Sequence, residues 1–196
     1  KKYLSRNKYM LKGSLKRKGY DWWWHSFTGY HKVTGKPKTF FIEYFVMNPA
    51  KNIKSPAFGQ TDGERLFNTE ASGTVKPSYV MIKAGAWGEN PKQIHNFYPT
   101  DDLVVNNRQL SVSVGNCVLT EDSLLGSVSL SSNDAASHPE YMSDSGYMSW
   151  NLKMDKQIPF CVGYGTSWLF RLLKIFQMYW HAQGVKTEYS GIVTLD

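Results

Sequence analysis

The chain has few of the residues that build metal sites, redox centres and membrane spans. Among 196 residues it has two cysteines, Cys117 and Cys161, and no CxxC pair or Cys/His cluster. We therefore expect no metal, and a reducing cytoplasm as the compartment, with one disulfide bond as the alternative. No apolar run approaches the ~20 residues that a membrane-spanning helix requires. No phosphate loop, nucleotide fingerprint or Ser-His-Asp order is present, so no cofactor is expected.

Acidic residues are missing from the start of the chain. Eight of the 23 basic residues precede the first acid, Asp21, so the net charge of +7 resides in a basic segment, 1–19, and the remainder is nearly neutral. A solvated N-terminal arm is the simplest interpretation. Clustered Lys and Arg also gain about 1 kcal/mol each near anionic lipid headgroups, which would allow peripheral membrane contact. The basic residues do not interleave with base-stacking aromatics, which argues against a nucleic-acid partner.

Aromatic residues are abundant, at 15% of the composition. Two aromatic runs within 21–49 flank a short Gly/Pro turn and predict a β-hairpin. Apolar side chains occupy both alternating faces of both runs, whereas a sheet with one wet face alternates apolar and polar residues. We expect one face of this hairpin to pack in a core and the other to border a cavity or a second layer.

Further strands are predicted from period-two patterns at 78–85, 93–98, 108–120, 126–130, 148–154 and beyond 177. The phase changes at Gly115-Asn116, which predicts a bulge or bend. The range 167–176 has the convincing helical period, while 50–76 and 131–145 read as polar loops. About nine short strands and one short helix predict an all-β antiparallel fold, either a barrel or a curved sheet sandwich, as a single domain over 20–196.

The order of these motifs resembles the tocopherol cyclase-like family. The segments DWWWHSF and FFIEYFVMNP resemble its first hairpin, SYVMIKAGAWGENPKQIHNFYP its next strand pair, and RQLSVSVGNCVLTEDSLLGSVSLS the hairpin after that. The stretch from Tyr147 through the helix to Tyr179-Trp180-His181 is similar to the remaining strands and helix. The resemblance implies a calycin-like, lipocalin-like barrel with a ligand cavity. It also implies that this chain is the N-terminal unit of a two-unit protein, with the C-terminal unit as its partner.

The same resemblance implies a cyclase or hydratase that protonates an isoprenoid double bond without a metal or redox cofactor. Such chemistry requires an acid in a dry pocket, with aromatic faces near the cation that forms. Glu43 is the first candidate, because burial in an apolar strand raises the pKa of a carboxyl group. An outward-facing position on a twisted edge, or pairing with Lys83 or His25, is the structural alternative. His25 and His181 are candidates for orienting or reprotonating the acid.

The candidate ligand contacts are Trp24, Tyr44, Trp87, Trp150, Trp180 and Lys83. Rings in strands also serve as plain core, and a lysine in a sheet can extend its amine to solvent. Three functions stay open: an acid-catalysing enzyme, a non-catalytic carrier of a hydrophobic lipid or pigment, and a carbohydrate-binding sandwich. Buried rings around a void would favour the first two, and exposed coplanar tryptophans on one face would favour the third.

Overall fold

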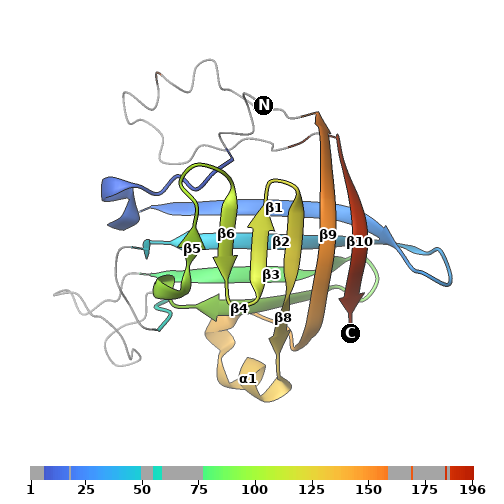
Figure 1. Ribbon diagram of the computed structural model, residues 1–196. Coiled ribbons are helices and arrows are strands. Elements are labelled where there is room, and N and C mark those ends of the chain that lie inside the picture. The colour runs from blue at the N-terminus through green and yellow to red at the C-terminus, as the bar shows by residue number, and fades with distance from the viewer. Residues whose placement is uncertain are drawn as a thin grey trace.

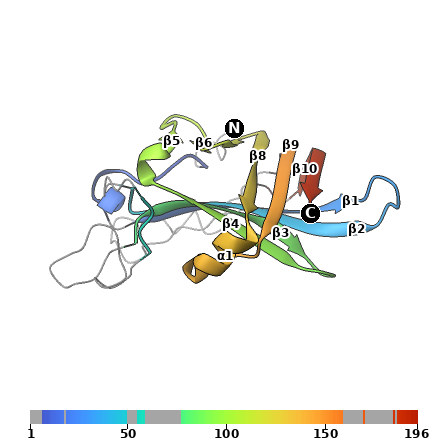
Figure 2. The same ribbon diagram turned by 90° about the horizontal axis from the view of Figure 1, so that it is seen from below.

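The computed structural model describes residues 7–17, 19–49, 55–58, 77–158, 169, 184 and 186–196. These residues form two antiparallel β-sheets that pack face to face as two layers, with the strands of one running across those of the other (Figures 1 and 2). The strand order is β1-β2-β3-β4 in one sheet and β10-β9-β8-β7-β6-β5 in the other. The prediction of an all-β antiparallel fold is therefore confirmed. Within the described ranges the sheets form a sandwich and do not close into a barrel.

The first sheet is built from the aromatic hairpin and the strand pair that follows it. Its strands are β1 (Tyr20–Tyr30), β2 (Pro37–Met47), β3 (Tyr79–Trp87) and β4 (Lys92–Tyr98). The hairpin pairs in continuous register from Tyr20↔Met47 to Tyr30↔Pro37, which confirms the predicted turn. Gly35 takes a positive φ of 69° in that turn, a conformation that glycine adopts without steric cost.

The second sheet follows directly along the chain. Its strands are β5 (Val104–Val105), β6 (Ser111–Val114), β7 (Cys117–Thr120), β8 (Ser123–Leu130), β9 (Gly146–Ile158) and β10 (Lys186–Leu195). The prediction of a bulge or bend at Gly115-Asn116 within one strand is wrong, because these two residues form a tight turn between two paired strands, β6 and β7. Val114 pairs with Cys117 across this turn, and Gly115 has a φ of 56°. The change of hydrophobic phase marks a reversal of direction within one sheet.

One short helical segment, η2 (Gly13–Arg17), precedes β1, and three others connect strands: η5 (Thr100–Asp102), α1 (Ser132–Ser137) and η6 (Pro139–Tyr141). The stretch predicted as a polar loop at 131–145 contains α1, which begins because the Ser131 side chain accepts a hydrogen bond from the Asp134 backbone N–H. The predicted helix at 167–176 lies outside the described residues except for Leu169, and most of the predicted loop at 50–76 also lies outside them.

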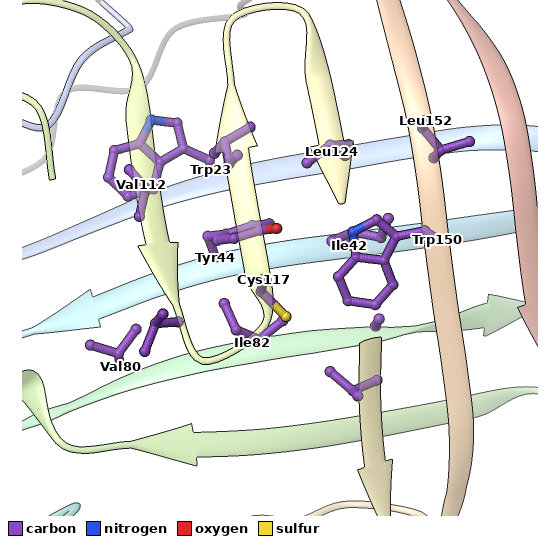
Figure 3. Packing of buried hydrophobic residues seen from close by; sticks show 14 of the residues in the cluster. Trp23, Ile42, Tyr44, Val80, Ile82, Val112, Cys117, Leu124, Trp150 and Leu152 are labelled. Carbon is purple, nitrogen blue, oxygen red and sulfur yellow. The ribbon is translucent and has the colours of Figure 1, made fainter. Parts of the chain in front are cut away.

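The core lies between the two sheets and is filled by side chains from both (Figure 3). Tyr44 of β2 and Trp150 of β9 lie in this interior and are 0% and 2% exposed. The first sheet also contributes Trp23, Ile42, Val46, Val80, Ile82, Ala84 and Ile94, and the second contributes Val112, Cys117, Leu119, Leu124, Val128, Met148 and Leu152. Burying a Leu, Ile, Val or Phe side chain stabilises the fold by about 1.5–3 kcal/mol, so this layer is the main source of stability.

Part of the basic N-terminal segment is anchored to the sandwich. Tyr9 and Leu11 are buried in the core cluster. The Trp23 indole N–H donates a hydrogen bond of 2.8 Å to the Asn7 carbonyl, and the Asn7 amide donates one of 2.8 Å to Glu121. The segment is thus not a wholly solvated arm, since residues 7–11 pack on both sheets.

Candidate functional site

Strand β2 is buried on both of its faces. Ile42, Tyr44 and Val46 belong to the core between the sheets, while Phe41 and Glu43 point to the opposite, outer side of the first sheet and are 2% and 4% exposed. The prediction that one face of the hairpin packs in a core is therefore confirmed, while the outer face is covered over β2 and half-exposed at Trp22 and Trp24 of β1. The outer side carries an aromatic face, which consists of Tyr20, Trp22, Trp24, Phe41, Phe45, Tyr79, Trp87 and Phe97.

Three rings form the centre of this aromatic face. Phe41 stacks against Trp24 with a centroid distance of 5.3 Å and against Trp87 with one of 4.8 Å. The two indoles lie 5.8 Å apart at an interplanar angle of 25°. Trp24 is 42% exposed and Trp87 is 44% exposed. A buried phenyl ring is thus flanked by two nearly parallel, half-exposed indoles.

Gly85 makes room for this stack. It is the cross-strand partner of Phe41, and a Cβ atom at Gly85 would lie 1.9 Å from the Lys92 carbonyl oxygen and 2.9 Å from the Phe41 ring. A side chain therefore cannot occupy this position without displacing backbone.

A second group of rings continues the aromatic face toward the edge of the sheet. Phe97 of β4 meets Phe58 edge-on at 4.7 Å and Tyr141 of η6 at 4.9 Å. His138 stacks on Tyr141 at 4.8 Å. These contacts bring residues from 55–58 and from η6 against the sheet.

A polar row crosses the aromatic face at one level. The register aligns Trp24 of β1 with Glu43, Glu43 with Lys83, and Lys83 with His95 of β4. The Lys83 ammonium nitrogen lies 2.5 Å from Glu43 Oε2, and the two side chains are 20% and 6% exposed. The same nitrogen lies 5.2 Å from the centroid of the Trp24 ring, within range for a cation–π interaction.

The structure therefore places Glu43 in the pairing that was the structural alternative to an acid role. A carboxyl group engaged by an ammonium group is not free to meet a substrate, as a general acid must. His25 lies on the opposite face of the sheet and does not take part in this pair. The ion pair is nearly buried and carries no net charge.

His95 belongs to the polar row and was not predicted from the sequence. Its Nδ1 lies 2.6 Å from the Tyr141 carbonyl oxygen, so Nδ1 carries the proton and donates the bond. Nε2 is buried without a hydrogen-bond partner in the described part of the chain. Burial lowers the pKa of His95, the Lys83 charge lowers it further, and the bond to Tyr141 opposes both effects. The ring is accordingly neutral. Its signal in the sequence is weak, because a histidine in QIHNFY becomes meaningful only once the register is known.

The other predicted site residues are dispersed. His25 lies in the core, 3.3 Å from the Tyr189 hydroxyl through Nδ1, and burial, aided by the Lys156 charge, lowers its pKa to about 3. Tyr44 is also interior, and burial raises the pKa of its phenol well above its ordinary value. Trp150 packs beside it (Figure 3). Trp180 and His181 lie outside the described residues. The structure therefore brings together Glu43, Lys83, Trp24 and Trp87.

Two open hollows lie on the second sheet, away from the aromatic face. One, of about 560 Å³, is lined by residues 104–108 and Ser111. The other, of about 510 Å³, is lined by residues of β8, β9 and β10 such as Leu125, Tyr147 and Ile192. Among the described residues no group of three or more His, Cys, Asp or Glu is placed to hold a metal ion. None of the helices in those ranges is long and apolar enough to cross a bilayer.

Comparisons of the chain with models of protein families, with curated proteins and with solved structures find no match.

Proposed function

We propose that the protein binds a neutral, largely apolar small molecule on the aromatic face, with the Glu43–Lys83 pair meeting its polar end. The observation that carries this proposal is the pair of half-exposed indoles, Trp24 and Trp87, stacked on buried Phe41 beside a nearly buried ion pair. Binding sites typically combine apolar walls with a small number of placed polar groups, and this face has that composition.

The exposed rings provide the affinity. A ligand that removes about 200 Å² of apolar surface from water gains roughly 5 kcal/mol before the entropic cost of association. Flat or extended conjugated molecules suit the site, because they can stack on both indoles at once.

The ion pair selects against charge. The pair carries no net charge, so a charged ligand would lose its hydration over these rings without gaining a net electrostatic attraction. A neutral dipole such as a carbonyl group can instead accept a hydrogen bond from Lys83. We therefore favour a neutral ligand, and we favour binding over protonation of an alkene because Glu43 is already paired with Lys83.

Nile red, an apolar dye that is neutral and fluoresces in apolar surroundings, tests this proposal by titration. Trp24→Ala combined with Trp87→Ala is expected to weaken dye binding at least tenfold, which corresponds to about 1.4 kcal/mol. The control is Tyr147→Ala, which removes a 39% exposed ring from the second sheet and is expected to change affinity less than twofold. Circular dichroism verifies that each variant is folded. Equal affinity in the double variant, or loss of binding in the control, would refute the proposal.

Carbohydrate binding is the second candidate, and the exposure and near-parallel arrangement of Trp24 and Trp87 favour it. Sugars stack on such indoles but also require many hydrogen-bonding partners, and here Glu43 and Lys83 are engaged with one another as an ion pair. Calorimetric titration with cellohexaose and xylohexaose decides between the candidates. Millimolar or tighter binding that disappears in the Trp24→Ala variant would support the second.

A further inference from the structure

We infer that Lys83 captures an apolar aldehyde as a Schiff base, with Glu43 first accepting the proton of the amine and then serving as counter-ion. This inference rests on the proposed function, since it names the chemical class of the ligand that the aromatic face would hold. It also assigns a covalent chemistry to a site in which the sequence suggested a general acid.

Lys83 differs from an ordinary surface lysine in its surroundings. Its side chain is 20% exposed, so it is largely covered by its neighbours but not fully buried. Glu43 lies 2.5 Å away on one neighbouring strand, and the Trp24 ring lies 5.2 Å away. A primary amine is thus held beside a proton acceptor and at the edge of an apolar surface.

An arriving ligand supplies the condition that activates the amine. The separated charges of the pair are stabilised partly by water, and an apolar molecule lying over Trp24 and Trp87 displaces that water. Transfer of one proton from Lys83 to Glu43 then converts two buried charges into two neutral groups. Lys83 is left with a free electron pair on its nitrogen, which is the nucleophilic form of a lysine.

The reaction balances with groups that are present. The nitrogen electron pair forms a bond to the aldehyde carbon, the carbonyl π pair moves to oxygen, and a proton passes from nitrogen to that oxygen. Glu43 then returns its proton to the hydroxyl group, the C–O bond breaks, and water leaves as the C=N bond forms. The sum is lysine ammonium plus aldehyde giving iminium plus water, with the Glu43 carboxylate regenerated.

The product keeps the electrostatic arrangement of the free protein. The iminium nitrogen carries the same positive charge as the original ammonium group, so Glu43 remains its counter-ion and the Trp24 face remains its neighbour. Trp87 and Phe41 lie next to Trp24 and would hold a conjugated chain attached to that nitrogen. Exclusion of water by these rings slows hydrolysis of the imine.

Retinal is a suitable probe, because it is an apolar aldehyde whose absorption reports imine formation and protonation. After incubation with retinal, cyanoborohydride reduces any imine to a stable amine, and peptide mass spectrometry locates the label. Lys83 is expected to carry at least tenfold more label than Lys153, an exposed lysine of β9. The absorption maximum of the unreduced complex is expected to shift to longer wavelength, as a protonated imine requires. Equal labelling of Lys83 and Lys153 would overturn the inference, and this comparison needs no variant.

Variants and a matched ligand complete the test. Lys83→Arg should abolish label at position 83, and Lys153→Arg should leave labelling of Lys83 unchanged. Glu43→Gln should slow labelling of Lys83 at least tenfold and abolish the red shift of the retinal absorption. Unchanged rate and colour in Glu43→Gln would overturn the role of Glu43. Retinol, which lacks the aldehyde, should displace Nile red without forming an adduct. If retinal displaces the dye but Lys83 stays unlabelled, the inference fails and the proposed function stands. If neither retinal nor retinol displaces a dye that binds through Trp24 and Trp87, the inference fails; if the dye does not bind through these two residues, the proposed function fails.

Discussion

The buried histidine of β1 provides a quantitative prediction about stability and pH. His25 is 4% exposed in the core, and burial lowers its pKa from an ordinary 6.5 to about 3. The unfolded chain therefore takes up a proton below pH 6.5, whereas the folded chain stays unprotonated until about pH 3. The stability that the neutral ring contributes is complete above pH 6.5 and is lost as the pH falls through the interval from 6.5 to 3.

The magnitude follows from the two pKa values. Within that interval each pH unit changes the free energy of unfolding by about 1.4 kcal/mol. Between pH 8 and pH 5 the loss due to His25 is about 2 kcal/mol. Replacing the ring by a group that does not titrate, as in His25→Phe, removes this loss. When the pH changes from 8 to 5, the free energy of unfolding of the variant should therefore rise by about 2 kcal/mol relative to that of the original protein.

Asp21 changes the free energy of unfolding in the opposite direction as the pH falls. The effect of His25 must therefore be measured as the difference between the original protein and the His25→Phe variant. Burial raises the pKa of Asp21 to about 6, against hydrogen bonds from the Met10 and Trp22 backbone N–H groups that lower it. The folded chain binds this proton first, so stability increases as the pH falls from 8 to 5, by about 1.4 kcal/mol. This term is present in both proteins and cancels when their curves are subtracted.

Urea unfolding at a series of pH values, followed by tryptophan fluorescence, measures the difference. Any packing change caused by the phenyl ring shifts the variant's curve equally at all pH values. Curves that stay parallel between pH 8 and pH 5 would show that His25 is not buried and neutral in the folded protein.

Two further predictions concern packing and reactivity. Gly85→Ala should destabilise the protein by at least the upper end of the ~1–3 kcal/mol typical of overpacking, because its Cβ would lie 1.9 Å from a backbone oxygen. The matched Gly29→Ala meets the movable Phe40 side chain at 3.0 Å, so thermal unfolding should show a smaller loss; equal losses would contradict the stated contact. Cys117 is buried and its pKa is raised to about 11 by burial, so iodoacetamide at pH 8 should modify it at least tenfold faster in urea than in buffer. Peptide mapping gives the rate at Cys117 alone, and equal rates would show that the thiol is accessible in the fold.

The sequence was informative wherever local pattern decides structure. The alternating runs located most strands of both sheets, although β5 was not predicted and the range 108–120 contains two strands, β6 and β7. The apolar character of both faces of the hairpin correctly indicated that β2 is buried on both sides. These features follow from the alternation of side chains along a strand. The pairing of Glu43 with Lys83 was identified as an alternative because both residues interrupt apolar strands.

The register between strands that are far apart in the chain could not be predicted from the sequence. Lys83 and His95 join Glu43 through the pairing of β2 with β3 and of β3 with β4, and no local pattern sets the offset between β2 and β3, which are separated by a long segment. Whether two sheets close into a barrel depends on strand tilt and stagger, which composition does not encode. The packing of Tyr9 and Leu11 was hidden because lysines and arginines dominate the segment around them.

The residues of the polar row lie side by side across the four strands of the first sheet, and this limits the length of a molecule bound along the row. Neighbouring strands lie about 4.8 Å apart, so the path from Trp24 on β1 to His95 on β4 spans roughly 14 Å across the sheet. A rod-shaped guest attached near Lys83 has about two strand spacings available toward β1 and one toward β4. The width of the sheet therefore limits the length of the ligand. We expect affinity to depend on how far a ligand chain extends from the Lys83 nitrogen toward β1 and toward β4.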